Sequence, residues 1–186
     1  MTELASPGQL RAAFLRWALF IIPGIMFLGF FSGMLSGSGP GNVWFIDLVK
    51  PALYPPPAVF GIVWPVLYFL MGAALTLVVT ARGAPGRGRA IALFALQFVL
   101  NLAWSPLFFA MHQIAAALGL LVAIDLAVLA TVAAFRTVRP LAAWLLLPYL
   151  AWILFATVLN WQFLEANPGG QPPVDVALNM MPTRSI

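Results

Sequence analysis

Aromatic and amide side chains recur at helical spacing along three stretches of the chain. The first stretch carries Phe60, Trp64, Tyr68 and Met71, the second Gln97, Asn101, Trp104 and Phe108, and the third Tyr149, Trp152, Ala156, Asn160 and Phe163. Steps of three and four residues place each set on one face of a helix. Three such faces turned toward one another would enclose a pocket with aromatic walls and a few amide groups, which suits a large, flat, apolar ligand with polar edges.

Few residues could support acid–base or metal chemistry. The chain has no cysteine, nucleophile elbow, phosphate loop, metal-binding helix pair or paired carboxylates. Asp125 stands in the middle of an apolar stretch, where an ionised carboxylate costs about 2.5–3.5 kcal/mol, so structural pairing and a proton or ion role are both open. His112 is either an ordinary surface group or a ligand to a porphyrin iron. We therefore do not expect an enzyme with conventional side-chain chemistry, and no cofactor is obligatory.

Five apolar stretches must position these side chains. Of the 186 residues, 63% are hydrophobic and 8% charged, against about 25% charged in typical soluble domains. Windows of about 20 apolar residues, the length that spans a bilayer as a helix, run over residues 14–36, 58–80, 90–111, 115–135 and 141–164. The sequence therefore predicts an all-α integral membrane protein, a five-transmembrane-helix bundle over residues 14–164.

Charge placement predicts the topology of this bundle. Seven of the nine basic residues fall on the side that holds the N-terminal tail, residues 1–13, and the positive-inside rule makes that side cytoplasmic. Loop 37–57 and the C-terminus then face away from the cytoplasm. The loop is either a structured lid or a flexible tether, and the tail over residues 165–186 is expected to be disordered. Because the basic residues are scattered, a nucleic-acid partner is not expected.

Span direction places several tryptophans in one half of the membrane. Trp64 lies near the start of the second span, whereas Trp104 and Trp161 lie near the ends of the third and fifth, so all three should lie beneath the loop that carries Trp44. An interfacial aromatic belt is the alternative, and for Trp44 it is the favoured one. The amides of the second stripe fit either ligand binding or hydrogen bonding between helices.

Longer motifs resemble one known family. They are Trp44-Phe45, Lys50-Pro51, Tyr54-Pro55-Pro56, Leu67-Tyr68-Phe69-Leu70-Met71-Gly72, Trp104-Ser105-Pro106-Leu107-Phe108-Phe109, and Pro148-Tyr149-Leu150 followed by Trp152, Phe155-Ala156-Thr157 and Leu159-Asn160. With five similarly spaced spans, the stretch from about Gly24 to Asn167 resembles the TspO/MBR family, the translocator and tryptophan-rich sensory proteins.

The resemblance implies a function and a set of site residues. It implies a membrane receptor or sensor, commonly a homodimer, that binds porphyrins such as protoporphyrin IX and haem under the first loop, linked to tetrapyrrole regulation or stress. Alternatives are a transporter of such ligands and a light-dependent porphyrin-degrading enzyme that uses Trp64 and Trp161. Together with the stripes, it predicts these ligand-binding residues: Trp44, Phe60, Gly61, Val63, Trp64, Tyr68, Asn101, Trp104, Gly119, Tyr149, Trp152, Ala156, Leu159, Asn160 and Trp161.

Departures from the family pattern bear on other ligands. Where animal members carry a tyrosine and a basic residue in their sterol-recognition segment, this chain has Trp161 and Glu165, so sterol binding is not expected. Ala116 replaces an aromatic residue that contacts drugs in the animal proteins, which puts sensitivity to those compounds in doubt.

Overall fold

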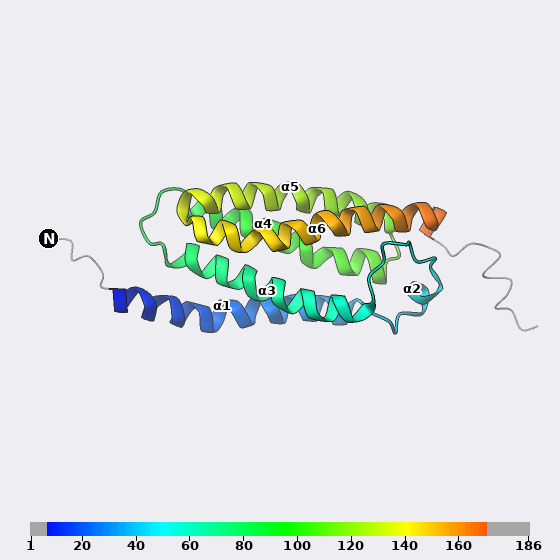
Figure 1. The fold of residues 1–186 in the computed structure, drawn as a ribbon, viewed down its shortest axis with the longest axis horizontal. Coiled ribbons are helices and arrows are strands. Elements are labelled where there is room, and N and C mark those ends of the chain that lie inside the picture. Colours follow the sequence, from blue (N-terminus) through cyan, green and yellow to red (C-terminus); the bar gives the residue numbers. More distant parts are fainter. Residues whose placement is uncertain (1–6, 171–186) are drawn as a thin grey trace, which may run out of the picture.

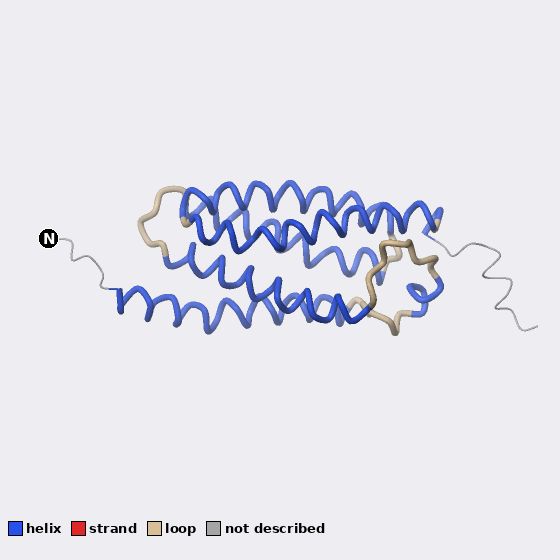
Figure 2. Tube along the Cα trace, viewed as in Figure 1, coloured by secondary structure: helices blue, strands red, loops and turns tan. Residues whose placement is uncertain are grey.

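Five long helices run side by side in one bundle (Figures 1 and 2). The computed structural model describes residues 7–170. Its elements are α1 (Pro7–Leu35), α2 (Val43–Asp47), α3 (Pro57–Thr80), α4 (Arg87–Ser105), the π-helical turn η1 (Pro106–Ala110), α5 (Ile114–Val138), α6 (Pro140–Ala166) and the 3₁₀ turn η2 (Pro168–Gly170). No strand occurs between residues 7 and 170, and the five long helices are apolar enough to cross a membrane. The all-α fold class is confirmed.

Two ends of the chain differ from the expected pattern. Residues 7–13 of the expected N-terminal tail already belong to α1, because a helix can continue past the apolar stretch that marks the lipid. At the other end, α6 continues to Ala166, and Asn167 is fully buried, so residues 165–170 are ordered. The rest of the tail expected to be disordered, residues 171–186, lies outside the described residues.

A proline shapes the end of the third long helix. Pro106 has no backbone N–H, so it cannot donate to the carbonyl of Leu102 as a helical residue would. The hydroxyl of Ser32 on α1 donates to that carbonyl instead, at 2.6 Å. The helix then widens into η1, in which the N–H of Met111 donates to the carbonyl of Pro106 at 2.9 Å. The carbonyl that Pro106 leaves free on α4 thus accepts a hydrogen bond that joins α4 to α1.

Small residues let α1 and α3 pack closely. A Cβ atom added to Gly72 would lie 2.9 Å from the Cα of Ile22, so only glycine allows this backbone contact. Nearer the α2 end, the ring of Tyr68 covers Gly29 so closely that an added Cβ would lie 2.3 Å from its Cζ atom. Gly29 therefore serves packing between helices within the chain.

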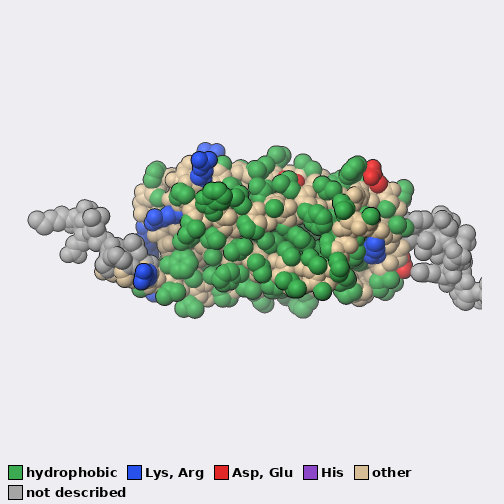
Figure 3. All heavy atoms as spheres, in the orientation of Figure 1, with side chains coloured by type: hydrophobic (Ala, Val, Ile, Leu, Met, Phe, Trp, Pro, Cys, Tyr) green, Lys and Arg blue, Asp and Glu red, His purple; other side chains and the backbone are tan. Residues whose placement is uncertain are grey.

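The outer surface matches a lipid environment. Hydrophobic side chains cover the length of the bundle, whereas lysine and arginine gather mainly at the end that carries the N-terminus (Figure 3). Large apolar side chains such as Phe20 and Trp144 are 78% and 70% exposed. In water this surface would be costly, but hydrocarbon solvates it.

Candidate ligand-binding site

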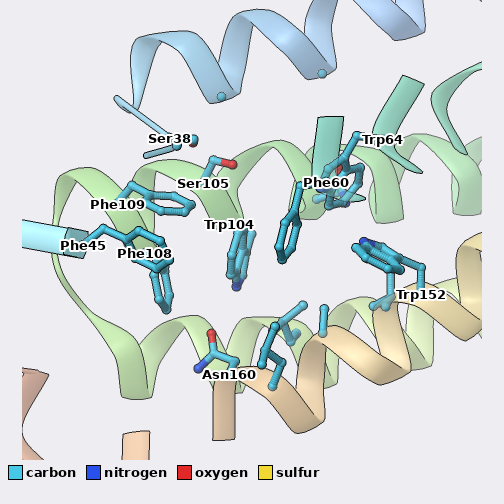
Figure 4. Close-up of a pocket in the computed structure, with 18 of the residues that line it drawn as sticks. Ser38, Phe45, Phe60, Trp64, Trp104, Ser105, Phe108, Phe109, Trp152 and Asn160 are labelled. Carbon is cyan, nitrogen blue, oxygen red and sulfur yellow. The ribbon is translucent and has the colours of Figure 1, made fainter. Parts of the chain in front are cut away.

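A cavity of about 420 Å³ lies inside the bundle at the end that carries α2 (Figure 4). Every long helix contributes to its walls. Its lining comprises Gly29, Phe30, Gly33, Met34, Ser38, Gly39, Pro40, Phe45, Tyr54, Pro57, Phe60, Gly61, Trp64, Tyr68, Asn101, Trp104, Ser105, Phe108, Phe109, Leu121, Ile124, Trp152, Ile153, Ala156, Leu159, Asn160 and Phe163. Its volume falls in the range of about 300–1,000 Å³ that is common for small-molecule sites.

Aromatic rings form most of the wall, and helical spacing pairs them. Trp64 stacks on Tyr68 one turn later, with ring centroids 5.2 Å apart, and Trp104 stacks on Phe108 at 5.0 Å. Between helices, Phe60 of α3 meets Trp152 of α6 edge to face at 5.7 Å. Figure 4 shows Phe60, Trp104 and Trp152 directed into the same space. These surfaces offer faces for a flat aromatic ligand to stack on.

The polar groups of the cavity are uncharged, and two of them have no partner. The Nε1 of Trp104 and the Oδ1 of Asn160 are buried without a hydrogen-bond partner among residues 7–170. The other end of the Asn160 amide donates to the carbonyl of Ile114 at 3.0 Å, which fixes its orientation. Figure 4 shows Trp104 and Asn160 on facing walls. An unpaired donor and an unpaired acceptor therefore lie in the cavity wall, each covered by neighbouring atoms.

No lysine, arginine, histidine, aspartate or glutamate occurs among the described residues that line the cavity. Asp125, the carboxylate of the spans, lies outside it between α5 and α6. Its Oδ2 accepts a hydrogen bond from the hydroxyl of Thr157 at 2.8 Å, and its buried Oδ1 has no hydrogen-bond partner in the described part of the chain. Structural pairing, one of the two expectations for Asp125, matches this contact.

A lid, defined here as residues 36–56 and including α2, lies at one end of the bundle (Figure 1) and contributes Ser38, Phe45 and Tyr54 to the cavity wall. Asn42 caps α2 by accepting from the N–H of Phe45 at 2.9 Å, and it also donates to the carbonyl of Phe109 at 3.2 Å. The Nε1 of Trp44 donates to the carbonyl of Gly170 at 3.1 Å. These contacts attach the lid to η1 and to η2, so the loop is a structured lid and not a tether.

An amide and an ammonium group complete the attachment of the lid. Asn167 holds the backbone of Val49 at both ends: its Oδ1 accepts from the N–H at 2.8 Å, and its Nδ2 donates to the carbonyl at 3.1 Å. Lys50 turns its Nζ back toward the end of α2, where it donates to the carbonyls of Phe45, Ile46 and Leu48. Burial lowers the pKa of Lys50, and the nearby Asp47 opposes this shift in part.

The structure gathers ten of the fifteen predicted site residues at the cavity. They are Phe60, Gly61, Trp64, Tyr68, Asn101, Trp104, Trp152, Ala156, Leu159 and Asn160. The hydroxyl of Tyr68 points to Asn101, with an oxygen–oxygen distance of 3.5 Å. The faces read from helical spacing on α3, α4 and α6 do enclose a common space.

Five predicted residues lie elsewhere. Trp161 is 49% exposed on the outside of α6, because it follows Asn160 by one residue and so points about 100° away from it. Gly119 is exposed on α5, Val63 packs beside the core, and Tyr149 is fully buried one turn further from the lid. Trp44 belongs to the lid and not to the wall.

His112 lies outside the cavity. Its ring stacks on that of Trp44 at 4.3 Å, with planes 13° apart. It therefore packs against the lid from the connection between η1 and α5, and it does not face the space in which a porphyrin iron would lie.

Several wall residues were not predicted as site residues from the sequence. They include the α1 residues Gly29, Phe30, Gly33 and Met34, the lid residues Phe45 and Tyr54, and Leu121 and Ile124 of α5. The repeat of glycine at every fourth position of α1 was the available signal for its face. Nothing in the local sequence marks Asn167, whose role depends on a backbone that lies 118 residues away in the chain.

Comparison with known proteins agrees with this architecture. The model of the TspO/MBR family matches residues 20–165. The chain is 40% identical to the human translocator protein over 144 residues, covering 76% of this chain and 85% of the relative. It is 37% identical to the tryptophan-rich protein TspO of Chlorobaculum tepidum over 139 residues (74% and 88%) and 39% identical to the tryptophan-rich sensory protein of Cereibacter sphaeroides over 124 residues (67% and 77%). With five apolar helices and these relatives, the chain is an integral membrane protein that belongs to the TspO/MBR family.

Proposed function

We propose that this protein is a membrane receptor or sensor that binds a porphyrin, such as protoporphyrin IX or haem, in the cavity beneath the lid. The observation that carries the proposal is the wall of stacked aromatic rings from Trp64 and Tyr68 on one side to Trp104 and Phe108 on the other. A porphyrin is flat and apolar over most of its surface, so it can stack on such rings. Its pyrrole nitrogens provide the polar groups that an unpaired amide or indole could meet.

A fluorescence titration tests this function. Protoporphyrin IX added to the purified protein in lipid nanodiscs should quench tryptophan fluorescence saturably. Trp64→Phe and Trp104→Phe should lower the affinity, since both rings line the cavity. Trp144→Phe is the matched control, because Trp144 is 70% exposed and distant from the lining. Quenching that does not saturate, or that is unchanged in both cavity variants, would contradict the proposal.

Light-dependent degradation of the porphyrin finds less support. The version expected from the resemblance uses Trp64 and Trp161 on one macrocycle, but Trp161 is exposed outside the cavity. Porphyrin binding, unlike this degradation reaction, requires only rings that line the cavity, such as those of Trp64 and Trp104. Transport would involve Asp125 as the ionisable group of the spans, yet that side chain is paired with Thr157 outside the cavity.

Topology and assembly complete the proposal. We infer that the N-terminus faces the cytoplasm and the lid faces away from it, because arginine side chains gather at the N-terminal end (Figure 3). Homodimer formation, which the family resemblance implies, remains a prediction, and the apolar outer faces of the helices would be available for it.

A further inference from the structure

The cavity has an exposed rim on one side only. Six of its lining residues are exposed, and all of them belong to α1, the lid or α3: Phe30, Met34, Ser38, Pro40, Pro57 and Gly61. The lining residues that α4, η1, α5 and α6 contribute are buried or half-buried. An opening bounded in this way lies between the lid ends of α1 and α3, and it faces sideways out of the bundle.

Glycines keep this part of the α1–α3 seam open. A Cβ atom added to Gly61 would have no neighbour within 4 Å, and one added to Gly33 would meet only Ser38 at 3.7 Å. Deeper in the same seam, a Cβ atom on Gly29 or Gly72 would clash with α3 or α1 respectively. The two helices are therefore in backbone contact at Ile22 and Gly72, whereas toward the lid a ring contact between Phe30 and Tyr68, with centroids 5.9 Å apart, joins them.

The route through the lid is blocked by hydrogen bonds. A ligand that came directly from water would have to break the double contact between Asn167 and Val49, or the bonds that Asn42 and Trp44 make to Phe109 and Gly170. Phe45 of α2 is buried against Phe163 of α6, with ring centroids 5.6 Å apart, so opening the lid would also break this apolar contact. The lateral opening requires none of these contacts to break.

The chemistry along the lateral route suits a ligand dissolved in lipid. Phe30 and Met34 are 48% and 70% exposed and lie on the surface that faces hydrocarbon. The described lining residues behind them include no lysine, arginine, histidine, aspartate or glutamate. An ionised carboxylate inside would lose its water without gaining a cationic partner. We propose that the ligand moves sideways from the membrane into the cavity between α1 and α3, with its apolar edge leading and any carboxylates left at the rim near Ser38.

Access kinetics test this route, which rests on the proposed function. The wild-type protein in phosphatidylcholine nanodiscs is mixed with protoporphyrin IX in a stopped-flow instrument, and dissociation is followed into excess empty nanodiscs. Gly61→Leu adds a side chain at the exposed rim, where its Cβ atom would meet no neighbour within 4 Å, and should slow association by about tenfold, which is about 1.4 kcal/mol on that barrier. Gly24→Leu on α1 is the control, because its added side chain also meets open space but lies outside the lining.

Asn167→Ala separates the two routes. Loosening the lid should leave the association rate unchanged if the ligand passes between α1 and α3, and should raise it if the ligand passes through the lid. The proposal is overturned if Asn167→Ala accelerates association, or if Gly61→Leu changes Kd without slowing association. Saturable binding with either of these kinetic outcomes leaves the proposed function intact, whereas wild-type protein that shows no saturable quenching overturns both.

Discussion

Asn167 gives the sharpest test of how the lid is held. Its side chain is fully buried and makes two hydrogen bonds to the backbone of Val49, at 2.8 and 3.1 Å. In Asn167→Ala both bonds are lost, together with the bond that Nδ2 of Asn167 donates to the carbonyl of Phe163 at 2.9 Å. The change leaves the helical part of α6 intact, because Asn167 follows its last residue.

The magnitude follows from the two bonds. Each intramolecular hydrogen bond contributes about 0.5–1.5 kcal/mol net, so their loss lowers the free energy of opening the lid by about 1–3 kcal/mol. Since about 1.4 kcal/mol corresponds to a factor of ten in an equilibrium constant, the open population should rise by about 5-fold to about 150-fold. The helices of the bundle pack independently of this contact, so their stability should change little.

Hydrogen–deuterium exchange measures this opening directly. A peptide covering residues 43–50 should exchange faster in Asn167→Ala by the factor given above, while peptides from α3 and α5 keep the wild-type rate. Glu165→Ala is the matched control, because Glu165 is exposed two residues earlier on α6. Unchanged exchange over residues 43–50 would refute the reasoning, and faster exchange throughout the bundle would show that Asn167 supports the whole fold instead.

Three further predictions concern packing, the buried carboxyl and the outward tryptophan. Gly29→Ala should lower the thermal unfolding midpoint, with an overpacking cost of about 1–3 kcal/mol against the Tyr68 ring, whereas Gly24→Ala, which has open space, should not; equal midpoints would show that the ring moves aside freely. Thr157→Val removes the 2.8 Å hydrogen bond to Asp125 and should destabilise the protein by about 1–3 kcal/mol, and adding Asp125→Leu should restore part of that loss; a double variant less stable than Thr157→Val would contradict simple pairing. Trp161→Phe should leave the affinity for protoporphyrin IX unchanged in the quenching titration, and a loss as large as that of Trp64→Phe would place Trp161 in the site.

The sequence by itself determined the helices and most of three cavity walls. Apolar length identifies a membrane helix because hydrocarbon demands about 20 residues without charge, a property of each segment alone. Helical spacing likewise fixes which side chains share a face, so Phe60 with Trp64, Asn101 with Trp104, and Ala156 with Asn160 could be grouped before any contact was known.

Only the tertiary structure decided which way each remaining residue faces and what covers the cavity. Trp161 lies at the expected depth but on another face of its helix, about 100° from Asn160, and the packing of the bundle leaves that face exposed. The face of α5 that carries Leu121 and Ile124 joined the cavity through packing that no local pattern encodes. The attachment of Val49 by Asn167 joins backbone and side chain 118 residues apart, so it exists only once the bundle has brought the C-terminal end of α6 next to the lid.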